Sequence, residues 1–148
     1  MNFSGKNSSV ALYNKNPEVL EDMRACLAKV TAMIPVERVT HGFGEATELK
    51  IGNRIYAELL KVLCGKGKSK RIPDFIFGLS KERIGQFLSG LFTGDGHTTA
   101  QSFGYTTILK ELAQQLQQLL LVYGIVSTVY RNKGKKTYGL AFYREEDK

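Results

Sequence analysis

Asp95 is the residue whose type and position most clearly suggest chemistry. It lies in Gly94-Asp95-Gly96, and apolar residues at helical spacing precede it from Ser80 onward, so the helix is predicted to end at these glycines. A carboxylate at a helix C-terminus meets the negative end of the helix dipole, which is unfavourable. A divalent cation such as Mg²⁺ removes that conflict, because it binds through one or two carboxylates together with phosphate oxygens and water. The pattern therefore predicts a metal-binding carboxylate at the end of a helix.

Small residues recur along the same predicted helix. Gly85 and Ser89 lie four residues apart in one row, and Gly90 and Gly94 form a second row. Glycine costs a helix roughly 1 kcal/mol relative to alanine, so repeated glycines indicate a packing reason. We expect Gly85, Ser89 and Gly90 to form an interface with a second helix. The alternative is an ordinary buried amphipathic helix with an aspartate in its last turn.

Residues 88–96, LSGLFTGDG, resemble the LAGLIDADG, or dodecapeptide, motif of homing endonucleases, and the intein-encoded branch is the most similar. Upstream, residues 70–74, KRIPD, resemble the basic-Ile-Pro-acidic segment that often precedes the second motif of the family. Downstream, residues 105–125 resemble the strand and helix that follow it. Thr93 departs from the motif, which usually has an acidic residue there, but the later acidic position that holds metal in the family is present as Asp95.

The resemblance implies metal-dependent, site-specific hydrolysis of both strands of DNA. Asp95 would hold Mg²⁺ or another divalent cation against the scissile phosphate, where the metal activates water. The family also uses a basic residue near the site, often a lysine; Lys50 fits by position in the first half, and Lys135 or Lys136 fits in the second. Because a family active site needs two motif helices, we expect a homodimer in which these helices of two chains pack together.

The elements predicted to position Asp95 repeat along the chain. The pattern predicts strand, helix, two strands and helix over residues 9–63, and helix, two strands, helix and two strands over 80–143. We therefore expect an α+β protein with saddle-shaped antiparallel sheets, in which one αββαββ half is complete and the other lacks its motif helix. The predicted division is a first half over residues 1–64, a basic linker and connection over 65–79, and a second half over 80–148.

The composition favours an anionic partner. The 148 residues carry a formal net charge of +7, with an isoelectric point near 9.4, which favours nucleic acid first and an anionic membrane second. A two-stranded ribbon can enter the DNA major groove and read base edges. Polar residues on exposed strands, and the basic residues of the predicted turn over residues 131–136, are therefore candidates for contact with double-stranded DNA. The predicted DNA-binding residues are Lys15, Arg38, Thr128, Tyr130, Arg131, Asn132, Lys133 and Lys136.

Other classes of function have less support in the sequence. No apolar run reaches the roughly 18 residues of a membrane-spanning helix, and no signal peptide is present, so we expect an intracellular, cytoplasmic protein without a membrane partner. Gly67-Lys68-Ser69 is not a P-loop, because Val62 stands where that motif has its first glycine. The ends lack the residues needed for splicing, so we do not expect the chain to splice itself. A catalytically inactive DNA- or RNA-binding remnant, or a maturase-like module, is the alternative function.

Overall fold

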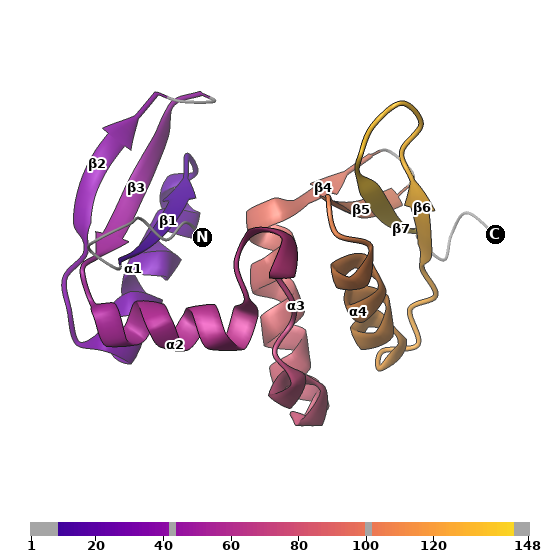
Figure 1. The fold of residues 1–148 in the computed structure, drawn as a ribbon, viewed down its shortest axis with the longest axis horizontal. Coiled ribbons are helices and arrows are strands. Elements are labelled where there is room, and N and C mark those ends of the chain that lie inside the picture. The colour runs from indigo at the N-terminus through magenta and orange to yellow at the C-terminus, as the bar shows by residue number, and fades with distance from the viewer. Residues whose placement is uncertain (1–8, 42–43, 100–101, 144–148) are drawn as a thin grey trace. The chain divides into compact units, whose positions relative to one another are not determined.

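The structure, a computed structural model, describes residues 9–41, 44–99 and 102–143. The chain divides into two compact units after Val62, and each unit contains helices and one antiparallel sheet (Figure 1). The predicted α+β class with antiparallel sheets is confirmed. Within the described residues, no helix is both long enough and apolar enough to cross a bilayer.

The first unit has the predicted order of elements. Its three strands lie in the order β1-β3-β2. The elements are β1 (Val10–Asn14), α1 (Pro17–Thr31), β2 (Val36–Thr40), β3 (Ala46–Ile51) and α2 (Arg54–Cys64), the last of which runs two residues past the boundary between the units.

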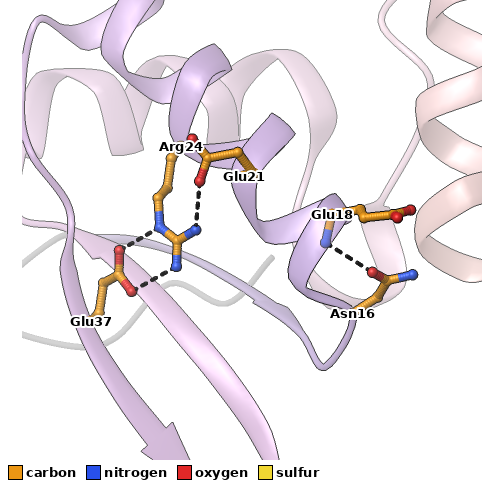
Figure 2. Close-up of polar contacts among 5 residues, drawn as sticks. All are labelled: Asn16, Glu18, Glu21, Arg24 and Glu37. Carbon is orange, nitrogen blue, oxygen red and sulfur yellow. Dashed lines mark hydrogen bonds and ion pairs between the residues drawn. The ribbon is translucent and has the colours of Figure 1, made fainter.

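Helix α1 begins at a capping signal that is present in the sequence, Asn16 followed by Pro17. The Asn16 side chain accepts a hydrogen bond of 2.9 Å from the backbone N–H of Glu18, and Pro17 occupies the first turn (Figure 2). An asparagine cap satisfies a backbone donor that the helix leaves unpaired, and proline has no N–H to lose there. The helix ends at Thr31, because Ala32 has a left-handed φ of 51°.

The core of the first unit lies between α1 and one face of the sheet. Leu20 and Leu27 of α1 pack against Leu49 and Ile51 of β3. Alternate strand residues point to opposite faces, and directly paired residues share a face. The opposite face, called here the outer face of the first sheet, therefore carries Tyr13, Arg38, Glu48 and Lys50.

The second unit contains the helix that ends at Asp95. Its four strands lie in the order β4-β5-β7-β6. The elements are η1 (Gly67–Ser69), η2 (Asp74–Gly78), α3 (Lys81–Asp95), β4 (Gly96–Thr98), β5 (Ser102–Thr107), α4 (Lys110–Leu121), β6 (Thr128–Arg131) and β7 (Tyr138–Tyr143).

The core of the second unit includes part of the predicted connection over residues 65–79. Ile72 and Ile76 are buried together with Leu88 and Leu116 in one apolar cluster. The backbone N–H of Ile72 also donates to the side-chain oxygen of Gln115 in α4, at 2.9 Å. The second half of the connection is therefore held in place by the same core that supports α3.

Candidate active site and nucleic-acid interface

Asp95 is the last residue of α3, and β4 begins at the next residue. Its side chain is exposed, at the helix end where backbone carbonyls concentrate negative charge. A single carboxylate with carbonyl oxygens nearby is a hard, all-oxygen donor set that suits Mg²⁺, provided that phosphate and water supply the other ligands. Across the described ranges, no three His, Cys, Asp or Glu side chains gather into a complete metal site. Asp95 could supply one carboxylate ligand to such a cation.

Tyr105 lies beside the strand that follows Asp95. It pairs with Gly96 across β4 and β5, and its ring meets that of Phe92 edge-on, with 6.2 Å between the centroids. Burial, and after it the negative charge of Asp95, raises the pKa of Tyr105 to about 12. Both causes disfavour the phenolate, so Tyr105 is a neutral side chain next to the candidate metal site.

His97 has a defined position on the sheet of the second unit. It pairs with Gly104 across β4 and β5, and a Cβ on Gly104 would lie 2.5 Å from the His97 Nε2 atom. The imidazole therefore occupies the space that a larger residue at position 104 would fill. In the sequence His97 stands directly after the motif, but its pairing with Gly104 depends on a strand register that the local sequence does not reveal.

The two rows of small residues on α3 have different surroundings. A Cβ on Gly85 would lie 2.4 Å from the hydroxyl oxygen of Tyr123. Tyr123 is fixed, because its hydroxyl donates to the backbone carbonyl of Lys81 and its ring lies 4.8 Å from the Lys81 ammonium. Gly85 is thus small for a reason within its own unit, whereas a Cβ on Gly90 or Gly94 would meet no described atom within 4 Å. The Gly90–Gly94 row is free surface, and Ser89 beside it is exposed.

The turn between β6 and β7 gathers positive charge. It is closed by hydrogen bonds from Asn132 to Thr137, 3.0 Å through the backbone and 2.8 Å through the side chains. Among the described residues, no carboxylate forms an ion pair with the four cations of this turn. The residues that line a hollow at this turn are Arg131, Asn132, Lys133, Gly134, Lys135 and Lys136, here called the basic turn. Four predicted DNA-binding residues and the predicted catalytic Lys135 are therefore neighbours.

The other predicted site residues are distributed over both sheets. Thr128 and Tyr130 share one face of β6, where the Tyr130 ring lies over Gly139 of β7. Lys50 is half-buried on the outer face of the first sheet, and Lys15 is exposed after the end of β1. Thr128 and Tyr130 thus belong to one unit, and Lys15 and Lys50 to the other.

The geometry does not bring Lys135 next to Asp95. Asp95 precedes β4, Lys135 follows β6, and these strands are the two edges of the sheet. Three strand spacings of about 4.8 Å each separate them, which exceeds the reach of a lysine side chain. Within this unit, Lys135 is therefore better placed to bind a phosphate than to act at the metal site.

Arg38 is part of a cluster that the sequence did not reveal. Its Nε lies 2.6 Å from Glu48 Oε2, and the Tyr13 hydroxyl donates to Glu48 Oε1 at 2.7 Å. Glu48 is only 8% exposed. Strand alternation could have placed Glu48 on the outer face, opposite to Leu49, but neither its burial nor its two partners follow from the local sequence.

Residues 82–148 match a family described as the LAGLIDADG-like domain. Among full-length proteins, the chain is 32% identical over 135 residues to a probable translation initiation factor IF-2 of Thermococcus kodakarensis. It is 34% identical over 125 residues to a DNA polymerase of Thermococcus litoralis, and 27% identical over 128 residues to the RNA polymerase subunit Rpo1C of Methanocaldococcus jannaschii. These alignments cover 86%, 83% and 85% of the chain. The chain spans only 12%, 7% and 15% of the three proteins' own lengths.

Two solved structures share the fold at low sequence identity. I-DmoI in complex with DNA and Mn aligns with a TM-score of 0.67 and 14% identity, over 91% of this chain and 73% of that one. The homing endonuclease I-WcaI bound to its DNA recognition sequence aligns with a TM-score of 0.61 and 16% identity, over 93% of this chain and 66% of that one. Residues 82–148 therefore belong to the LAGLIDADG-like domain family, and the chain has the fold of LAGLIDADG homing endonucleases.

Proposed function

We propose that this chain acts as a site-specific double-stranded DNA endonuclease that requires a divalent cation. The observation that carries the proposal is the exposed carboxylate of Asp95 at the C-terminus of α3, inside the motif that resembles the dodecapeptide. I-DmoI, which has the same fold, was crystallised with DNA and Mn and with DNA and Ca, and a variant of I-DmoI was crystallised with its target DNA in the presence of Mg. The fold, the motif and the all-oxygen character of the site support the same activity here.

The pattern of relatives supports an intein-type insertion. An initiation factor, a DNA polymerase and an RNA polymerase subunit perform different reactions, yet each contains a segment similar to this chain. In every case that segment is a small fraction of the whole protein. A segment shared by hosts that have no common activity is expected of an inserted element, and a homing endonuclease is such an element.

Each part of the second unit has a role in this proposal. Asp95 binds the cation, which, once bound, supplies Lewis-acid activation of water and of the scissile phosphate. The buried core beneath α3 holds in place the helix that ends at this carboxylate. The basic turn holds the DNA backbone through Lys133, Lys135 and Lys136, because each phosphate contact releases condensed counterions.

We further propose that a second copy of this chain completes the site. Gly90 and Gly94 leave one side of α3 open to close approach, and the adjacent Ser89 is small and exposed. A two-fold arrangement presents the same surface from both chains. It would therefore bring the two Asp95 carboxylates together, where they could share one cation or hold two. A longer host protein that supplies its own second motif helix is the competing arrangement.

The activity is tested by Asp95→Asn in a Mg²⁺-dependent nicking assay on plasmids that carry a randomised insert. We expect the parent to nick a subset of plasmids, and Asp95→Asn to lose nicking while it still binds duplex DNA. Asp74→Asn removes an exposed carboxylate from η2 of the same unit and should keep the activity. Cleavage that survives Asp95→Asn would remove the catalytic assignment. Duplex binding without nicking by the parent would favour the inactive DNA-binding alternative, and preference for RNA would favour the maturase-like one.

The dimer is tested by sedimentation of the parent and of Ser89→Leu at micromolar concentration. We expect a dimeric parent and a monomeric Ser89→Leu, because the leucine side chain prevents close approach of two helices. Asp95→Asn should remain dimeric, since its side chain differs little in size. A strictly monomeric parent would contradict the homodimer and favour a second helix from a longer chain.

A further inference from the structure

A row of three side chains crosses the outer face of the first sheet at one level. Glu48 of β3 is the direct partner of Tyr13 on β1 and of Arg38 on β2. Both carboxylate oxygens of Glu48 are engaged, one by the Tyr13 hydroxyl at 2.7 Å and the other by Arg38 Nε at 2.6 Å. The Glu48 side chain is 10% exposed and that of Arg38 is 57% exposed. The row therefore fixes the inner part of Arg38 and leaves its outer end in solvent.

The exposed end of Arg38 is a pair of donors with a defined orientation. A guanidinium carries five N–H donors in one plane, and the ion pair with Glu48 is made at Nε, 2.6 Å from Oε2. The structure records no partner for the two terminal nitrogens of Arg38 among the residues it describes. Because Nε is fixed and the group is planar, the direction of the terminal donors is restricted before any ligand binds.

The charge of the cluster makes a phosphate a poor ligand for Arg38. Glu48 cancels the positive charge at a distance of 2.6 Å, and its own negative charge repels a phosphate. A neutral group with two acceptors is repelled much less than a phosphate and still gains both hydrogen bonds. In the DNA major groove, guanine presents two such acceptors, O6 and N7, in the geometry that an arginine fork matches.

We propose that Arg38, oriented by Glu48 and Tyr13, reads one guanine in the major groove of the target DNA. This inference rests on the proposed function, because it requires that the outer face of the first sheet lie against duplex DNA. Arg38 is then a specificity-determining residue, and Glu48 and Tyr13 are its positioning residues. One bidentate arginine–guanine pair is worth roughly a 5- to 150-fold preference over another base at the same position.

The test is selection of bound duplexes from a randomised pool by the parent and by Arg38→Lys. Lysine keeps the positive charge beside Glu48 but lacks the planar fork, so the fold should be retained, which unfolding in urea checks. We expect the duplexes selected by the parent to carry guanine at one position. Those selected by Arg38→Lys should lose most of the guanine preference at that position alone. Affinity measured on single duplexes that differ only at that base should show the same loss.

The first unit offers a matched control on its other face. Arg24 of α1 binds Glu37 of β2 through Nε at 2.7 Å and through a terminal nitrogen at 3.0 Å, and it also contacts Glu21 at 3.0 Å (Figure 2). Arg24 is thus another arginine paired with a carboxylate of the same sheet, on the face that packs against α1. Arg24→Lys makes the same chemical change and should leave every base preference at the parental level.

Glu48→Gln tests the positioning role. The variant keeps the size of the side chain and an acceptor for Tyr13, but it removes the charge that holds Arg38. We expect the guanine preference to fall while the affinity for any duplex rises, because the released arginine is free to bind phosphate. A structural role alone would lower stability without moving these two quantities in opposite directions.

The outcomes separate this inference from the proposed function. A parent that selects a sequence, together with an Arg38→Lys variant that keeps the full preference at every position, would overturn the role of Arg38 and leave the endonuclease proposal intact. Loss of preference at the guanine position alone, with Arg24→Lys unchanged, would support it. A parent that enriches no sequence at all would overturn both proposals.

Discussion

Alkaline pH should destabilise the second unit through Tyr105. This side chain is 7% exposed and lies in the core formed by α3, α4 and the sheet. Its pKa is raised from the ordinary value of 10.0 to about 12, mainly because burial disfavours the phenolate and secondarily because Asp95 is negative. The folded chain therefore keeps a proton that the unfolded chain releases as the pH rises above 10.

The size of the effect follows from the pKa difference. The stabilisation is fully present below the unfolded-state pKa of about 10 and is lost as the pH rises toward the folded-state value. At pH 11 the expected loss in the free energy of unfolding is about 1.4 kcal/mol, since each pKa unit corresponds to about 1.36 kcal/mol. The full loss above pH 12 is about 2.7 kcal/mol.

Tyr105→Phe isolates this contribution, because phenylalanine keeps the packing against Phe92 and has no proton to release. The measurement is urea unfolding of the parent and of Tyr105→Phe at about pH 9 and about pH 11, pH values that bracket the start of the loss. The difference in stability between the two proteins should change by about 1.4 kcal/mol between these conditions. Tyr143→Phe, which changes an exposed tyrosine of the same sheet, should retain the parental loss. If the free energy of unfolding falls by the same amount in the parent and in Tyr105→Phe between these two pH values, the reasoning is refuted.

Two alanine substitutions should separate the two rows of small residues on α3. Gly85→Ala places a methyl group 2.4 Å from the Tyr123 hydroxyl, so we expect a loss of about 1–3 kcal/mol in urea unfolding, the usual cost of overpacking. Gly90→Ala meets no described atom within 4 Å; it should stabilise a monomer by up to about 1 kcal/mol through helix propensity and weaken the proposed dimer in sedimentation. Equal effects of the two substitutions would contradict the assignment of the rows.

Local signals were sufficient to predict the elements that carry the candidate site. Helix α3 ends at Asp95 because apolar residues at helical spacing stop at two glycines, and α1 starts at Pro17 because Asn16 is a strong cap. Strand boundaries were less accurate. Alternating residues predict a strand over residues 125–131, but β6 begins only at Thr128, because the alternation starts in residues that form no ladder. The residue pattern also predicts a strand over residues 97–101; His97 and Thr98 belong to β4, Thr99 follows its end, and residues 100 and 101 lie outside the described residues.

Contacts between distant segments could not be predicted from one sequence. Gly85 is small because of Tyr123, 38 residues later, and a pattern of glycines four apart does not distinguish that contact from a second helix. Ile72 and Ile76 stand in or beside a run of basic and small residues that indicates a solvated linker, yet both are buried. Glu48 looks like an ordinary polar residue of a half-exposed strand until Tyr13 and Arg38 are seen on either side of it.

The division of charge between the two units assigns the salt dependence of the proposed DNA binding to the second unit. Through Val62 the sequence has eight basic and seven acidic residues, and from Leu63 onward it has thirteen and seven. The first unit therefore has almost no net charge, and its arginine at position 38 is neutralised by Glu48. If the chain binds DNA as proposed, attraction to the DNA backbone comes mainly from the second unit, where the basic turn has no acidic partner among the described residues.

Replacing Lys133, Lys135 and Lys136 by glutamine tests this assignment. Each lost phosphate contact makes the plot of log affinity against log salt shallower by about 0.9, so the triple variant should be shallower than the parent by up to about 2.7. Arg38→Lys should leave the slope unchanged, because it keeps its charge and is proposed to face a base. Both slopes are measured by titrating a fluorescently labelled duplex with protein at a series of salt concentrations and recording the fluorescence anisotropy. An unchanged slope in the triple variant would mean that the basic turn does not touch phosphate, since a solvated turn releases no counterions from DNA.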